Sequence, residues 1–194
     1  MFKTCFVGIP LVIASLFSFF GVNPLPYKKY ERLMGSIINT SINQLSKRYG
    51  VVPCGRGGGV VPNESGDGNL DYKSKNEFIA FQLERQVSKE EARVLIVEIA
   101  ELILHHINTT PEIQPYLNND PFTYKNLELV IYLSNKDESK IYDPELGLVA
   151  LTRRGNVNFA TYKPGKLCSR ATDEEEPYEE TYRIATGREY SESH

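Results

Sequence analysis

The chain is short of the residues on which most catalytic sites depend. Its 194 residues include no tryptophan, three cysteines and three histidines, and His194 is the last residue. No Gly-x-Ser-x-Gly nucleophile elbow occurs. No Gly-Lys-Ser/Thr follows the glycine run, so the lysine and hydroxyl of a Walker phosphate loop are missing. The sequence therefore predicts no catalytic residues, no metal site and no cofactor.

The chain also lacks an excess of basic charge. Its 22 Lys and Arg against 25 Asp and Glu leave a net charge of -3, and basic side chains are not interleaved with aromatic ones, so we expect no nucleic-acid partner. The hydrophobic share of 41% and the charged share of 24% are typical of a globular domain.

The N-terminus carries a targeting signal. Residues 4–22 are uncharged, and Lys3 with the terminal amine supplies a positive start, as in a secretory signal. The segment is nearly long enough to span a bilayer. Cleavage after Gly21 would place Phe19 at the third-last position, where a signal peptidase prefers a small residue. We therefore expect residues 1–22 to be a signal peptide or, if uncleaved, a membrane anchor. The protein would then be exported, either secreted or held in the cell envelope; a buried core helix is the alternative.

Apolar periodicity predicts two long helices. Between residues 27 and 49, apolar side chains recur at steps of three and four. Ser88-Lys89-Glu90-Glu91 is a capping box, and it begins a strongly apolar helix that extends to about Ile107. The segment 51–75 between them holds most of the glycine and is predicted to be an irregular loop.

Four segments have strand patterns. Residues 77–83 are apolar on both faces, which is typical of a strand covered on both sides. Residues 127–133 alternate, and the strand-helix-strand order favours parallel pairing of these two strands. Residues 146–153 and 157–162 flank a turn and predict a hairpin. An acidic final helix is expected from Thr172.

Together these elements predict an α+β fold: a small mixed sheet of about four strands packed against two long helices, after an N-terminal apolar helix. The globular domain would span residues 27–170, and an acidic C-terminal helix or tail would span 171–194. Cys54 and Cys168 are the cysteines of the domain. In an exported protein they predict a disulfide, with two free thiols as the alternative.

The middle of the chain carries a resemblance. From Ser88 to Phe122 it contains Glu-Glu-Ala-Arg at a helix start, then Ile107-Asn108, Pro115-Tyr116-Leu117 and Pro121-Phe122, after a Gly57-Gly58-Gly59 run. This block resembles a group of uncharacterised exported proteins of intracellular bacteria. The resemblance implies secretion or an envelope location, and it implies no activity.

The glycine run is the first candidate binding site. Consecutive glycines let backbone N–H groups close around an anion, and Arg56 beside Gly57, Gly58 and Gly59 supplies positive charge. A flexible or tightly turned loop without a ligand is the alternative.

The second candidate is the polar face of the apolar helix. Glu98, Glu101 and His105 share one face at steps of three and four, and such a set could bind zinc or perform acid–base catalysis. A solvated stripe explains the same residues. With the glycine run, this face supports the alternative function, a small hydrolase or metal-dependent enzyme.

Charge supplies the third candidate. Arg153, Arg154 and Lys163 lie in a stretch without acids, and six acidic residues follow closely. On a hairpin, Arg153 and Lys163 could approach as cross-strand neighbours and form a basic patch for a protein or anionic-surface partner. An acidic helix folded over this patch is the alternative. The leading hypothesis is an exported or membrane-tethered interaction domain without enzymatic activity.

Overall fold

The structure is a computed structural model that describes residues 25–64, 70–137, 139–165 and 169–191. The predicted targeting segment, residues 1–22, lies outside these ranges. None of the helices in the described part of the chain is long and apolar enough to cross a membrane.

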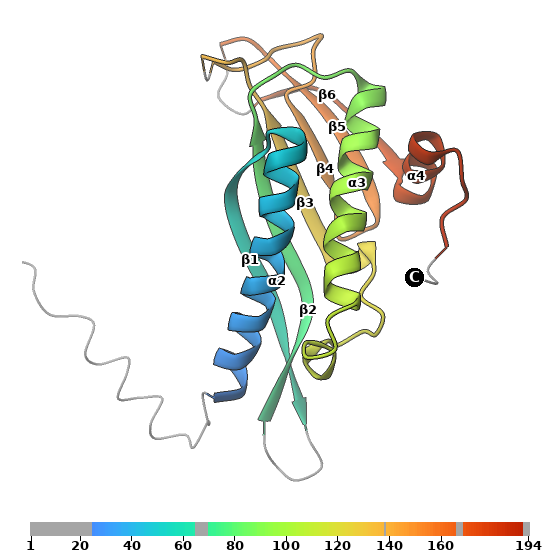
Figure 1. Cartoon of the computed structure of the whole chain (residues 1–194). Coiled ribbons are helices and arrows are strands. Elements are labelled where there is room, and N and C mark those ends of the chain that lie inside the picture. The colour runs from blue at the N-terminus through green and yellow to red at the C-terminus, as the bar shows by residue number, and fades with distance from the viewer. Residues whose placement is uncertain (1–24, 65–69, 138, 166–168, 192–194) are drawn as a thin grey trace, which may run out of the picture.

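Six strands form one mixed sheet in the order β1-β2-β3-β4-β5-β6 (Figure 1). Their bounds are β1 Val52–Glu64, β2 Leu70–Leu83, β3 Leu127–Leu133, β4 Leu148–Leu151, β5 Asn156–Tyr162 and β6 Arg170–Pro177. β2 and β3 pair in parallel, as the strand-helix-strand order predicted. The other neighbours are antiparallel, and β4 with β5 is the expected hairpin.

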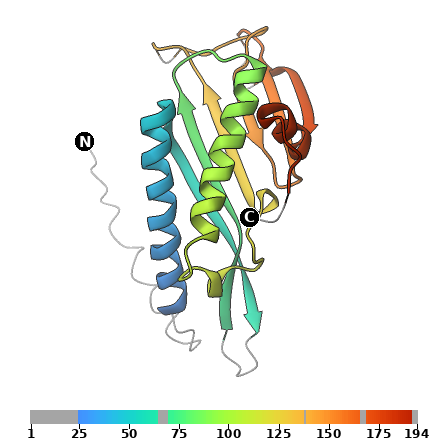
Figure 2. The ribbon, with the colours of Figure 1, turned by 45° about the vertical axis from the view of Figure 1, so that its right-hand side comes forward.

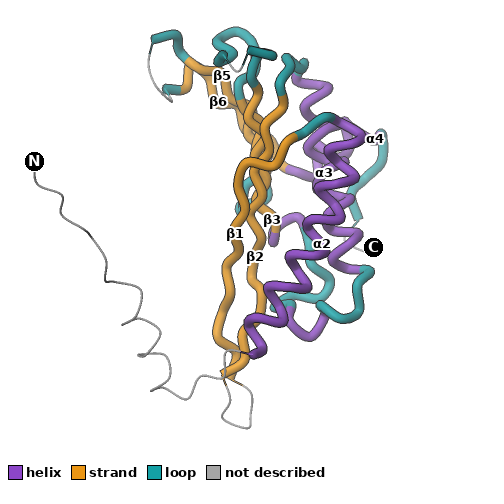
Figure 3. Tube along the Cα trace, turned by 60° about the vertical axis from the view of Figure 1, so that its left-hand side comes forward, coloured by secondary structure: helices purple, strands orange, loops and turns teal. Residues whose placement is uncertain are grey.

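The helices lie on one face of this sheet (Figure 3). They are α2 (Leu25–Tyr49), α3 (Lys89–Asn108) and α4 (Tyr178–Thr186), with short 3₁₀ turns at Gln114–Tyr116 and Tyr124–Asn126. Figure 2 shows α2 and α3 side by side, with α4 beside the β5–β6 end. The α+β class and the mixed sheet are as predicted.

The two long helices follow their sequence signals closely. α2 buries Tyr30, Met34, Ile38 and Leu45, which lie on the predicted apolar face. At the start of α3, the Ser88 side chain accepts a hydrogen bond of 3.1 Å from the backbone N–H of Glu91, as a capping residue does. Burial of these two faces against the sheet makes the main core.

Apart from residues 65–69, which lie outside the described ranges, the segment 51–75 is not the irregular loop that the sequence predicted. Residues 52–64 form β1, which pairs with β2 from Val52 opposite Gln82 to Glu64 opposite Leu70. Glycine weakens a strand through its entropy, but the long partner β2 supplies a ladder of hydrogen bonds, interrupted by register shifts at Pro53/Gly55 and Gly59/Val60. β1 therefore adds a fifth strand to the about four that the sequence predicted, and β6 is the sixth.

The final helix does not begin at Thr172. Residues 170–177 form strand β6, and α4 begins at Tyr178. The acidic residues alternate along β6, so that Glu174 and Glu176 face the helices and meet basic side chains of α3. A helix from Thr172 would not place these two carboxylates on one side.

The prediction that residues 77–83 are covered on both faces is wrong in part. The helices cover one face only, and Phe78 on the other face is half-buried. Tyr132 of β3 is 44% exposed there. A small second cluster shields part of this open face and consists of Leu148, Ala150, Ala160, Val130 and Tyr162.

Candidate functional site

The glycine run lies in the edge strand β1, and its backbone is accessible. Gly57 and Gly58 are exposed. Among the described residues, no strand pairs with the outer side of β1. An edge strand presents alternate N–H and C=O groups that another chain can pair with. Because these glycines are extended within a ladder, they do not form the anion-binding loop considered from the sequence.

A buried carboxylate lies directly beside this strand. Glu77 of β2 has a side chain that is only 2% exposed. Its Oε1 accepts a short hydrogen bond from the Tyr30 hydroxyl and one of 3.3 Å from Ser74 Oγ. Its Oε2 faces Arg56 Nη2 at 3.9 Å, an ion pair too long for a hydrogen bond.

Burial dominates the acid–base properties of this cluster. Burial raises the pKa of Glu77, although the hydrogen bonds from Tyr30 and Ser74 and the charge of Arg56 oppose the rise. The pKa of Tyr30 is raised above its ordinary value by burial and by the negative charge of Glu77. The Tyr30 hydroxyl therefore remains a donor to the carboxylate.

The glycines make room for these side chains. A Cβ on Gly58 would lie 2.9 Å from Glu77 Oε1, and a Cβ on Gly59 would overlap Asn76 Oδ1. A Cβ on Gly35 of α2 would lie 3.4 Å from Arg56 Nη1. At each of these three glycines, a polar side chain therefore packs against the backbone where a Cβ would otherwise lie.

These groups surround a pocket of about 350 Å³ that is open to solvent and is lined by Tyr30, Glu31, Arg56, Gly57, Gly58, Val60 and Glu77. The structure thus brings together three of the sequence-predicted residues, Arg56, Gly57 and Gly58. Sequence reasoning missed the carboxylate at the centre. Its signal was a charged residue at position 77, two positions before Ile79 on the face that β2 buries.

Cys54 precedes the glycines in β1. It is a free, exposed cysteine, and partial burial raises the pKa of its thiol. Cys168, the other half of the predicted disulfide, lies outside the described residues. The disulfide therefore stays a prediction.

The residues of the alternative enzyme site do not all come together. Glu98 pairs with Arg48 at 3.3 Å, and Glu101 accepts a hydrogen bond of 3.0 Å from the Tyr178 hydroxyl. Glu101 and His105 line a different pocket, of about 360 Å³, to which the glycine run does not contribute. The described residues contain no group of three His, Cys, Asp or Glu placed to hold a metal ion.

The expected basic patch does not form either. Arg153 lies in the turn between β4 and β5, where its Nε donates to Glu128 Oε2 at 2.8 Å. Arg154 is the next residue of the same turn. Lys163 follows the far end of β5, so a strand of seven residues, about 23 Å, separates it from that turn. The prediction that Arg153 and Lys163 approach as cross-strand neighbours was wrong, because Arg153 lies in the turn rather than in a strand.

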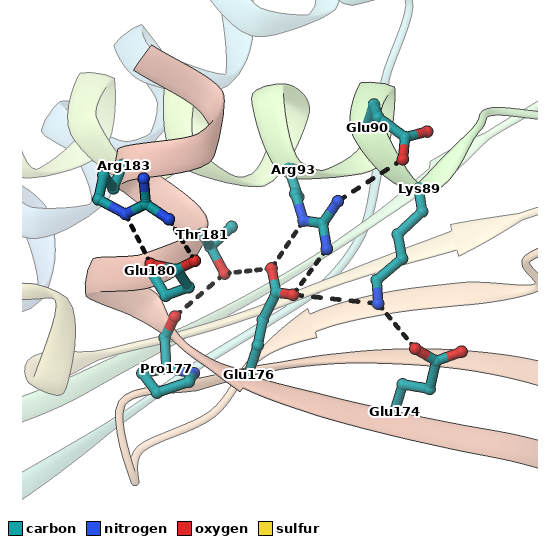
Figure 4. Close-up of polar contacts among 9 residues, drawn as sticks. All are labelled: Lys89, Glu90, Arg93, Glu174, Glu176, Pro177, Glu180, Thr181 and Arg183. Carbon is teal, nitrogen blue, oxygen red and sulfur yellow. Dashed lines mark hydrogen bonds and ion pairs between the residues drawn. The ribbon is translucent and has the colours of Figure 1, made fainter. Parts of the chain in front are cut away.

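The acidic segment binds α3 instead of covering that hairpin (Figure 4). Nε and Nη2 of Arg93 donate to the two carboxylate oxygens of Glu176, each at 2.8 Å. Lys89 Nζ lies 2.7 Å from Glu174 Oε2, and Thr181 Oγ1 donates to Glu176 at 2.8 Å. The segregated charges of the sequence thus hold the edge of the sheet to a helix.

Comparison of the chain with models of protein families, with curated proteins and with solved structures finds no match. The resemblance to exported bacterial proteins therefore stays a prediction. Function has to be inferred from the geometry around β1.

Proposed function

We propose that this protein is an exported or membrane-tethered interaction domain that binds an extended segment of another protein along the free edge of β1. The observation that carries the proposal is the accessible glycine-rich edge of a 13-residue strand. In strand addition, the main chain of the edge supplies hydrogen bonds and pockets beside it supply specificity.

The contrast between the two edges of the sheet supports this function. β6 carries Asp173, Glu174 and Glu175 in succession, and charged side chains on an edge oppose pairing with another strand. Between Val52 and Val61, β1 carries one charged residue and four glycines. The charged edge therefore resists addition of a strand, and the glycine-rich stretch of β1 between Pro53 and Pro62 permits it.

Two further observations agree with the proposal. The uncharged segment 4–22 supports export or tethering. Glu101 and His105 line a different pocket from the glycine strand, and this counts against the composite site of the enzyme alternative. An interaction domain needs no such site, because its affinity comes from backbone pairing.

Photo-crosslinking in the native host tests the proposal. A photoreactive residue at Gly57 is tolerated, since no atom of the described residues lies within 4 Å of a Cβ there. We expect it to capture one extended segment of a partner. When that segment is synthesised and added to the purified full chain, amide hydrogen exchange in β1 should slow.

The same photoreactive residue at Asp173 in β6 is the matched control. Equal capture at both edges would contradict the proposal. So would a captured segment that leaves hydrogen exchange in β1 unchanged.

A further inference from the structure

One oxygen of the buried Glu77 carboxylate lacks a hydrogen bond. Tyr30 and Ser74 both donate to Oε1. Oε2 has only Arg56 Nη2 nearby, at 3.9 Å, and none of the described residues donates a hydrogen bond to it. Oε2 keeps contact with the solvent of the open pocket, where an incoming group can reach it. This oxygen is therefore suited to a donor that comes from another molecule.

Gly58 leads from the sheet edge to this carboxylate. It is paired with Glu77 in the β1–β2 register, and its missing Cβ would lie 2.9 Å from Oε1 and 3.2 Å from Oε2. Side chains at opposite positions of neighbouring strands project from the same face of a sheet. A residue of an added strand opposite Gly58 would therefore project toward Glu77, with no glycine side chain in between.

The charge of the pocket favours a cation. Glu31 and Glu77 contribute two carboxylates to the lining, and Arg56 contributes the single guanidinium. With both acids ionised, one negative charge is left unbalanced. The Arg56 guanidinium lies between this carboxylate of Glu77, 3.9 Å away, and Gly35 of α2.

We infer that the segment bound along β1 carries a lysine opposite Gly58, whose ammonium enters the pocket and donates a hydrogen bond to Glu77 Oε2. This inference rests on the proposed strand addition and adds the chemistry by which the partner is recognised. A lysine fits the pocket because its ammonium is compact, and its three donors can reach the two carboxylates.

Two short synthetic peptides test the inference on the full chain in detergent micelles. Both alternate threonine and valine; one has a central lysine and the other has norleucine there. Amide chemical shifts of Gly57 and Gly58 report binding. We expect the lysine peptide to bind about tenfold more tightly than the norleucine peptide, as for a hydrogen bond to a charged group.

The preference should disappear in Glu77→Gln and weaken in Glu31→Gln, and it should persist in Glu112→Gln, an exposed glutamate that does not line the pocket. Glu31 is exposed, so its variant tests the charge of the pocket even if Glu77→Gln fails to fold. Loss of the preference in Glu31→Gln then supports the inference.

The outcomes separate this inference from the proposed function. Equal binding of both peptides at β1 would contradict the recognition of a lysine and leave the proposed strand addition intact. Binding of neither peptide would overturn both. A dimer of the chain that pairs β1 with β1 and excludes the peptides would also overturn the inference, in favour of a second copy as the occupant.

Discussion

Arg93 and Glu176 form a two-pronged ion pair in which Nε and Nη2 each donate a hydrogen bond of 2.8 Å to a different carboxylate oxygen (Figure 4). The two side chains are 13% and 14% exposed. The pair joins α3 to the last strand, which no apolar side chain of its own anchors strongly. Parallel hydrogen bonds between charged groups are among the stronger polar contacts.

Loss of this pair should destabilise the fold. Glu176→Gln leaves Arg93 without its main carboxylate partner, and we expect the free energy of unfolding to fall by about 2 kcal/mol. Urea denaturation measures the change. Glu180→Gln is the matched control, because its pair with Arg183 is solvent-exposed and should add little. Equal effects of the two variants would contradict the assignment.

The same residue should make the protein sensitive to acid. Burial alone would raise the pKa of Glu176, but hydrogen bonds from Arg93 and Thr181 outweigh it and hold the pKa below its usual range. The contribution is therefore complete above the pKa of the unfolded chain, about 4.3, and is lost as the pH falls through the folded-state pKa. Urea titrations below pH 5 should show a shallower loss of stability in Glu176→Gln than in the unmodified chain.

Glu77 should act with the opposite sign. Burial raises its pKa in the folded protein, so the folded chain holds this proton more tightly than the unfolded chain does. Its contribution to stability should therefore decrease as the pH rises from about 4.3 through the raised pKa. In Glu77→Gln, the free energy of unfolding should no longer show this decrease when it is measured between about pH 4 and about pH 8, a range that begins near the ordinary pKa of glutamate. A variant that keeps the full pH dependence would show that another group causes it.

Three neighbouring glycines should respond differently to a methyl group. Gly58→Ala and Gly59→Ala would press against Glu77 and Asn76, and each should lower the free energy of unfolding by about 1–3 kcal/mol. Gly57→Ala meets no described atom within 4 Å and should be neutral or slightly stabilising. Thermal or urea unfolding of the three variants measures this order. Equal losses would mean that strand flexibility, and not space, requires glycine.

The thiol of Cys54 should be free. Cys54 is an exposed cysteine of β1, and none of the described residues forms a disulfide with it. We therefore expect an alkylating reagent to label Cys54 in the native chain, as mass spectrometry would show. A nonreducing peptide map with a Cys54–Cys168 cross-link would instead support the disulfide predicted from the sequence.

The elements with local signals were predictable from the sequence. The apolar stripe of α2 and the capping box at Ser88 placed both long helices within two residues at their starts. Clean alternation placed β3, and the turn around Gly155 placed the β4–β5 hairpin. In each case, residues only a few positions apart determine the structure, so a short window holds the information.

The binding site depended on contacts between distant residues. Whether the glycines of β1 form a loop or a strand depends on pairing with β2. Whether the acids of β6 form a helix or a strand depends on pairing with β5 and on the ion pairs with α3. The local run of glycines around Arg56 was enough to suggest these residues as candidates. Only the tertiary structure placed Glu77 beside them, because burial of that charge results from packing α2 over a strand more than forty residues away.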